Sequence, residues 1–208
     1  MSGNYKDKDK GGFTLIEAIV SIAIVTVIMS VVLFNYSTFS DNLALSSAAQ
    51  EMAVTIRQAQ TYGLSVKEVT PTGGVFDKAY GVYFDVNDQL NYYLFVDSNG
   101  DKKYNGSSEL IEKVSLRNGI KVSNVCNETA CPPVATVKIM DVTFLRPNPD
   151  AKIFFTDSNT PSNFMGKSPL ISPFTGYLTG KVVLRSPKGK TLYVTIESTG
   201  QVLVGNII

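Results

Sequence analysis

Residues 10–34 read KGGFTLIEAIVSIAIVTVIMSVVLF, and the last 22 of them form an apolar block with one charged residue, Glu17. As a helix, this block would span ~33 Å at ~1.5 Å per residue, enough to cross a hydrocarbon core of ~30 Å. The twelve residues before it carry three lysines and two aspartates. Because basic residues stay on the cytoplasmic side, we predict a single-pass protein of the cytoplasmic (inner) membrane with its N-terminus inside. The part of the chain after the block, its head, would then be periplasmic or extracellular.

This block differs from an ordinary secretory signal, whose apolar region of ~7–15 residues precedes the small residues of the cut. Here the small pair Gly11-Gly12 comes first. A carboxylate in a membrane costs at least ~2.5 kcal/mol, so Glu17 calls for a partner. A cut before Phe13 would create an amine one helical turn from Glu17, where the helix dipole also favours a carboxylate. The alternative is that Glu17 lies shallow and is solvated at the lipid surface.

The segment Lys10-Gly11-Gly12-Phe13-Thr14-Leu15-Ile16-Glu17 resembles the type IV prepilin cleavage and methylation signature, which pilins and type II secretion pseudopilins share. The resemblance implies that a prepilin peptidase/methyltransferase cuts after Gly12 and N-methylates Phe13. It further implies that Glu17 guides docking by pairing with the terminal amine of a neighbouring subunit. Residues 1–12 would then be a cytoplasmic leader, and residues 13–34 the transmembrane and assembly helix.

Beyond the apolar block, apolar or small residues recur at spacings of four and three, namely Leu45, Ala49, Met52, Ile56, Ala59 and Gly63. This stripe predicts one helix over residues 13–66, whose part from 35 to 66 is an amphipathic continuation packed under a globular head. Polar residues cluster at 35–42, so two helices broken there are the alternative. A coiled-coil dimer is a weaker one, because the stripe covers fewer than ~3 heptads.

Residues 67–208 are predicted to be a β-rich head, because short segments dense in Val, Ile, Tyr and Phe alternate with turn residues. The expected strands are 80–86, 90–96, 110–116, 136–145, 152–155, 181–185, 191–197 and 202–207. The fold class is therefore α+β: a long N-terminal helix packed on antiparallel sheets, which is the type IV pilin-like architecture. The ending 194–202, VTIESTGQV, resembles the C-terminal hairpin of minor pseudopilins and fimbrial-transport-type minor pilins, as does an aspartate-rich loop after a mid-chain strand. This implies a minor subunit.

That loop reads DSNGD over residues 97–101 and places oxygens at alternate positions, as calcium loops do. The candidate calcium ligands are Asp97, Asn99, Asp101 and Asn105. The pattern is incomplete, because Lys102 replaces the glycine of an EF-hand and Glu109 comes one residue late. The other interpretation is an ordinary turn between strands.

Three further features are candidates for contacts or cross-links. Cys126 and Cys131 are predicted to form a disulfide if the head lies outside the cytoplasm. Residues 181–190 contain four basic residues around a turn and no acidic residue. This pattern would allow phosphate contacts with DNA, but a solvated hairpin is the commoner explanation. The turn-rich stretch 157–177 is expected to be a long loop that contacts a partner.

The composition argues against an enzyme. The chain has no histidine or tryptophan, two cysteines, and 19 basic against 18 acidic residues. This excludes histidine-based triads and histidine-ligated metals, and no phosphate-binding loop is present. We predict a structural subunit that requires no cofactor, and the resemblance implies as partners other pilin or pseudopilin subunits, the lipid bilayer and an inner-membrane assembly platform with a motor ATPase. The alternative is a membrane-anchored binding module, such as a DNA-uptake or adhesive minor pilin.

Overall fold

The computed structural model describes residues 12–65, 78–128, 131, 137–157 and 177–205. The chain divides into two compact units, Met1–Ser40 and Asp41–Ile208. One long helix, α1 (Leu15–Leu64), has residues in both units. The single predicted helix is thus confirmed, and the interpretation as two helices broken at 35–42 is wrong. Val66, the predicted last residue, lies outside the described residues.

The described part of the first unit is mainly an exposed apolar helix. Every residue from 13 to 34 is exposed, and two hydroxyl side chains of the block bond within the helix. The hydroxyl of Thr26 donates to the carbonyl of Ile22, and that of Ser30 donates to the carbonyl of Thr26, each at 2.8 Å. Such bonds satisfy the hydroxyls without water. By length and composition, the helix can cross a membrane.

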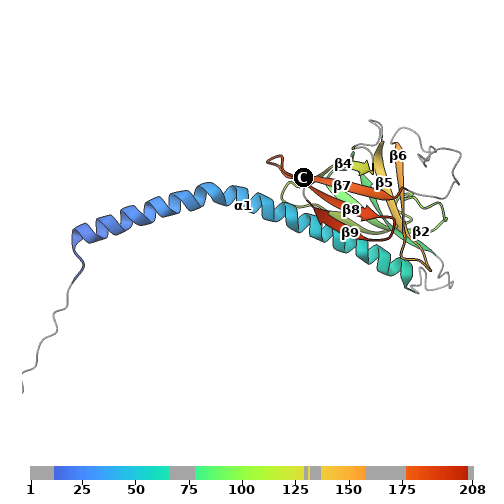
Figure 1. Ribbon diagram of the computed structural model, residues 1–208, viewed down its shortest axis with the longest axis horizontal. Helices are drawn as coiled ribbons and strands as arrows, with labels where there is room; N and C mark the ends of the chain where they lie inside the picture. Colours follow the sequence, from blue (N-terminus) through green and yellow to red (C-terminus); the bar gives the residue numbers. More distant parts are fainter. Residues whose placement is uncertain (1–11, 66–77, 129–130, 132–136, 158–176, 206–208) are drawn as a thin grey trace, which may run out of the picture. The chain divides into compact units, whose positions relative to one another are not determined.

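The second unit contains two antiparallel sheets (Figure 1). The five-stranded sheet has the order β3-β2-β1-β5-β6, and the four-stranded sheet has the order β4-β7-β8-β9. The strands are β1 (Ala79–Asp85), β2 (Asn91–Asp97), β3 (Leu110–Ser115), β4 (Lys121–Asn127), β5 (Val137–Phe144), β6 (Ala151–Asp157), β7 (Thr179–Arg185), β8 (Thr191–Glu197) and β9 (Val202–Gly205). An α+β fold, with a helix on a β-sheet head, is therefore confirmed.

The core of this unit lies between residues 41–64 of α1 and the sheets. All six residues of the predicted stripe are buried, and all but Gly63 belong to one apolar cluster with the inward faces of both sheets. Gly63 permits a close approach, because a Cβ at this position would stand 2.9 Å from the carbonyl carbon of Phe144 on β5. The small residues of the stripe thus let the helix backbone approach the five-stranded sheet directly.

One strand was not predicted. β4 pairs with β7, but its register shifts between Val122 and Asn124. The bulge puts buried Val122 and Val125 three positions apart, so the strict alternation that marks a strand is lost.

Candidate functional site

The junction before the apolar helix is open to solvent. Phe13 is 85% exposed, and nothing lies within 4 Å of the position that a Cβ on Gly12 would occupy. Both residues precede the first residue of α1, so their peptide bond is non-helical. A peptidase could therefore reach this bond, and a cut there would leave the helix intact.

Thr14 starts the helix, and this role was not predicted. Its hydroxyl oxygen accepts the backbone N–H of Glu17 at 3.3 Å, and its carbonyl accepts the N–H of Ala18 at 3.2 Å. Threonine followed three residues later by glutamate is the capping-box pattern, which would have revealed the cap in the sequence. The cap fixes Glu17 in the first turn of the helix.

Glu17 is exposed, and residues 12–40 contain no lysine or arginine. Within that part of the first unit, no basic side chain is available to pair with this carboxylate. A cut after Gly12 would create an amine four residues away, at the positive end of the same helix dipole. Gly12, Phe13 and Glu17 thus lie together at one helix start, as their sequence spacing requires.

Residues 7–33 match the family model for the prokaryotic N-terminal methylation motif, which is the type IV pilin and pseudopilin signature. The chain carries the prepilin motif. No curated protein and no solved structure gave a match. The motif indicates a pilin-like or pseudopilin substrate, implies processing by prepilin peptidase and assembly with other pilins, and implies a structural subunit.

Away from the prepilin motif, the predicted calcium residues lie at the last residue of β2 and in the loop from β2 to β3. Asp97 is buried, and its carboxylate accepts the backbone N–H groups of Gly100 at 2.7 Å and Lys102 at 2.9 Å. The carboxylate of Asp101 accepts the N–H of Lys103 at 2.9 Å and the side-chain amides of Asn99 and Asn105 at 3.0 and 2.8 Å. The four predicted ligands are thus in one loop, which its own N–H donors hold in place.

Glu109 completes this network, although sequence reasoning placed it one residue late for a ligand. It is buried, and its two carboxylate oxygens accept the N–H groups of Ser98 at 3.0 Å and Asn105 at 2.9 Å. Among the described residues, no group of three or more Asp, Glu, Cys or His side chains is placed to hold a metal ion. Calcium binding by the loop therefore stays a prediction.

If the loop binds calcium, the ion should raise the melting temperature of the full chain in detergent, because a ligand that binds only the folded state stabilises it. We expect Tm to be higher with millimolar Ca²⁺ than with EDTA, and Asp97→Asn to abolish this difference. Ser107→Ala, a change in the same loop outside the ligand set, should retain it. Equal Tm values for the unmodified chain in Ca²⁺ and EDTA would contradict the prediction.

The same loop covers the outer face of the five-stranded sheet through Tyr104. Its ring packs on Tyr93, Phe95 and Tyr83, with centroid distances of 5.4, 5.6 and 5.0 Å. Its backbone N–H donates to the Oδ1 atom of Asp141 on β5 at 3.1 Å. Burial raises the pKa of the Asp141 carboxyl to about 7, and the N–H bond and the charge of Lys103 only partly offset this effect.

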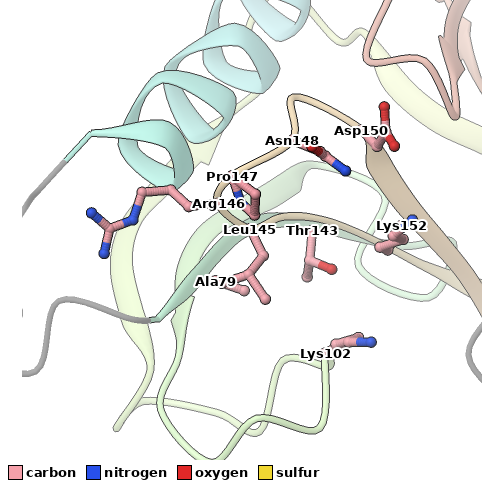
Figure 2. Close-up of a pocket in the computed structure, with 9 residues that line it drawn as sticks. All are labelled: Ala79, Lys102, Thr143, Leu145, Arg146, Pro147, Asn148, Asp150 and Lys152. Atoms are coloured by element: carbon pink, nitrogen blue, oxygen red, sulfur yellow. The ribbon is translucent and has the colours of Figure 1, made fainter.

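A small cavity of about 170 Å³ lies between this loop and the turn from β5 to β6. Its lining includes Lys102, Arg146, Asp150 and Lys152 (Figure 2). Figure 2 shows the guanidinium of Arg146 pointing away from the other labelled side chains. The basic groups do not converge on one point, so the cavity is not organised as an anion site.

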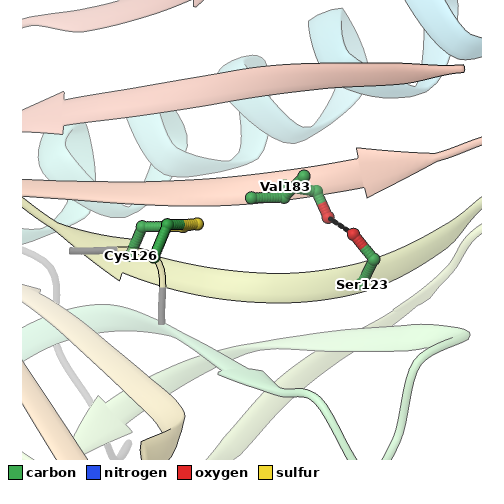
Figure 3. The surroundings of a disulfide bond; sticks show 4 residues. Ser123, Cys126 and Val183 are labelled. Carbon is green, nitrogen blue, oxygen red and sulfur yellow. Dashed lines mark hydrogen bonds between the residues drawn. A yellow bond between two sulfur atoms is a disulfide. The ribbon is translucent and has the colours of Figure 1, made fainter. Parts of the chain in front are cut away.

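Cys126 and Cys131 are joined by a disulfide, with 4.3 Å between their Cα atoms. Cys126 is buried at the end of β4 (Figure 3), and on the same strand the hydroxyl of Ser123 donates to the carbonyl of Val183 on β7 at 3.2 Å. The bridge closes a short loop beyond the bulged strand. Of the predicted partner loop 157–177, residues 158–176 lie outside the described residues.

The predicted basic hairpin is the β7–β8 turn, and it is fixed to the start of the helix segment in the second unit. The hydroxyl of Ser186 donates to Asp41 at 2.7 Å, and the Lys190 amine donates to the side-chain oxygen of Asn42 at 2.6 Å. Arg185, Lys188 and Lys190 are exposed around the turn. Their charges are thus presented from a fixed position on the head.

Proposed function

We propose that the chain is a minor pilin or pseudopilin, a structural subunit of a type IV pilus or a type II secretion pseudopilus. It is cut after Gly12, N-methylated on Phe13 and held in the inner membrane by residues 13–34 until it is assembled. The observation that carries this proposal is the methylation motif over residues 7–33, placed on an exposed junction and followed at once by a helix able to cross a membrane.

The proposed assembly step uses the exposed apolar helix. Residues 13–34 leave the lipid and pack against the same segment of neighbouring subunits, while Glu17 accepts the terminal amine of one neighbour. An ion pair in a low-dielectric surrounding has strong geometric demands, so this contact would set the axial register. The assembly platform and its motor ATPase would supply the energy.

Intact mass and N-terminal sequencing of protein extracted from the membranes of its own host test the proposal. We expect a chain that starts at Phe13 and carries one added methyl group. Gly12→Leu, which puts a bulky side chain at the cut, should leave the chain at full length, whereas Gly3→Leu in the leader should be processed normally. An intact Met1 on the unmodified protein would overturn the proposal.

A further inference from the structure

The end of the second unit at which residue 41 lies carries a group of exposed basic residues. In addition to the turn residues Arg185, Lys188 and Lys190, it contains Lys121, which pairs in register with Arg185. It also contains Arg117 in the β3–β4 loop, where a Cβ on Gly119 would stand 2.8 Å from Pro187. We call these five residues, Arg117, Lys121, Arg185, Lys188 and Lys190, the basic end.

The carboxylates near the basic end already have hydrogen-bond donors. Asp41 accepts the hydroxyl of Ser186. The β1–β2 turn also lies here, because the N–H of Val122 donates to the carbonyl of Gln89 at 2.8 Å. In that turn, Asp85 accepts the N–H of Asn87, and Asp88 accepts from Asn91 and Tyr93. Among the residues that the structure describes here, five cations stand against these three carboxylates, which gives the surface a positive excess.

The chain itself limits how far this surface can be from the membrane segment. Only seven residue steps separate Phe34, the last residue of the apolar block, from Asp41, to which the turn is bonded. They span ~10 Å as a helix and at most ~25 Å when fully extended. A head tethered at this point keeps the basic end near any bilayer that holds residues 13–34.

We propose that the basic end docks on the anionic phospholipid headgroups of the bilayer that holds the N-terminal helix. This inference rests on the membrane anchoring in the proposed function. Polybasic surfaces next to a membrane anchor are attracted to anionic lipids, and the attraction falls off within a Debye length of ~8–10 Å. The hydrogen bonds of Ser186 and Lys190 to Asp41 and Asn42 hold the turn beside the residues through which the chain joins the head to the membrane segment.

The absence of tryptophan from the chain permits a direct test. Pro187→Trp places a single tryptophan at the exposed turn, and lipids with a headgroup nitroxide quench its fluorescence on contact. The full-length chain is reconstituted into phosphatidylcholine vesicles, with and without phosphatidylglycerol. We expect stronger quenching with phosphatidylglycerol and loss of this excess at high salt.

Two triple variants, each of which removes three positive charges, show whether the lipid-dependent quenching arises at the basic end. Each lysine or arginine at an anionic surface strengthens binding about fivefold. Arg185→Gln, Lys188→Gln and Lys190→Gln together should therefore lower the ratio of docked to undocked heads by on the order of 100-fold. The control is Lys102→Gln, Arg146→Gln and Lys152→Gln around the cavity of Figure 2. The β5–β6 turn there bonds Gln60, ~28 Å along α1 from Asp41, so the control should quench like the unmodified chain.

The remaining outcomes separate the two proposals. If the chain floats with the vesicles but is quenched equally in both lipids, docking of the basic end on anionic headgroups is overturned. The membrane anchor is then unaffected. A chain that does not float with the vesicles overturns the anchor and this inference together. If the basic end binds nucleic acid instead, duplex DNA will bind the chain in phosphatidylcholine vesicles, the triple variant will lose this binding, and quenching will not depend on phosphatidylglycerol.

Discussion

Glu17→Ala should insert into the membrane and be cut after Gly12, yet its incorporation into filaments should fall at least tenfold. Glu17 is the one charge in the apolar block, and residues 12–40 offer no basic side chain to pair with it. After processing, the terminal amine of a neighbouring Phe13 is the proposed partner. An unpaired carboxylate in lipid costs at least ~2.5 kcal/mol. Pairing it on assembly should therefore raise the association constant of the subunit with the filament by more than tenfold.

The measurement is the share of processed protein that is recovered in sheared filaments or in cross-linked pseudopili. Ser21→Ala is the matched control, because residue 21 lies one helical turn beyond Glu17 on the same exposed face and the substitution also removes a polar group. It should assemble normally. Full incorporation of Glu17→Ala would show that the carboxylate does not set the register, while a block at cleavage would place its role before assembly.

The N-terminal helix of this architecture could be predicted because its signals are local. The apolar block follows from the length of an almost uncharged apolar run, and the stripe from Leu45 to Gly63 follows from helical periodicity. The start of α1 was also predictable from Thr14 and Glu17, since the capping box needs only four residues. The bulge in β4 shifts its buried residues out of alternation, and nothing local replaces the lost signal.

The contacts that build the head's surface could not be predicted, because they join distant positions. Asp141 lies on the outward face of a strand, where a charged residue is normally solvated. It is buried only because Tyr104, 37 positions earlier, folds across the sheet. Likewise, the lysines near residue 188 were expected at a hairpin tip, but their place on the head depends on the contact of Ser186 with Asp41, 145 positions away.

Asp141→Asn should stabilise the protein at pH 8 and have little effect at pH 4. The asparagine keeps the oxygen that accepts the Tyr104 N–H and removes the charge that burial penalises. The folded-state pKa of Asp141 is raised to about 7, against about 3.9 in an unfolded chain. The folded state therefore binds the proton more tightly, so its contribution to stability is full below pH ~4 and is lost as pH rises to ~7.

The expected gain at pH 8 is about 2–4 kcal/mol, or roughly 5–15 °C in Tm, because one pKa unit corresponds to about 1.4 kcal/mol. Thermal unfolding of the full chain in detergent, with EDTA present so that no cation contributes, measures it. Glu112→Gln removes an exposed carboxylate from β3 of the same sheet and should change Tm little at either pH. A gain for Asp141→Asn that is the same at pH 4 and pH 8 would point to packing, and no gain at pH 8 would mean that the loop admits enough water to solvate the charge.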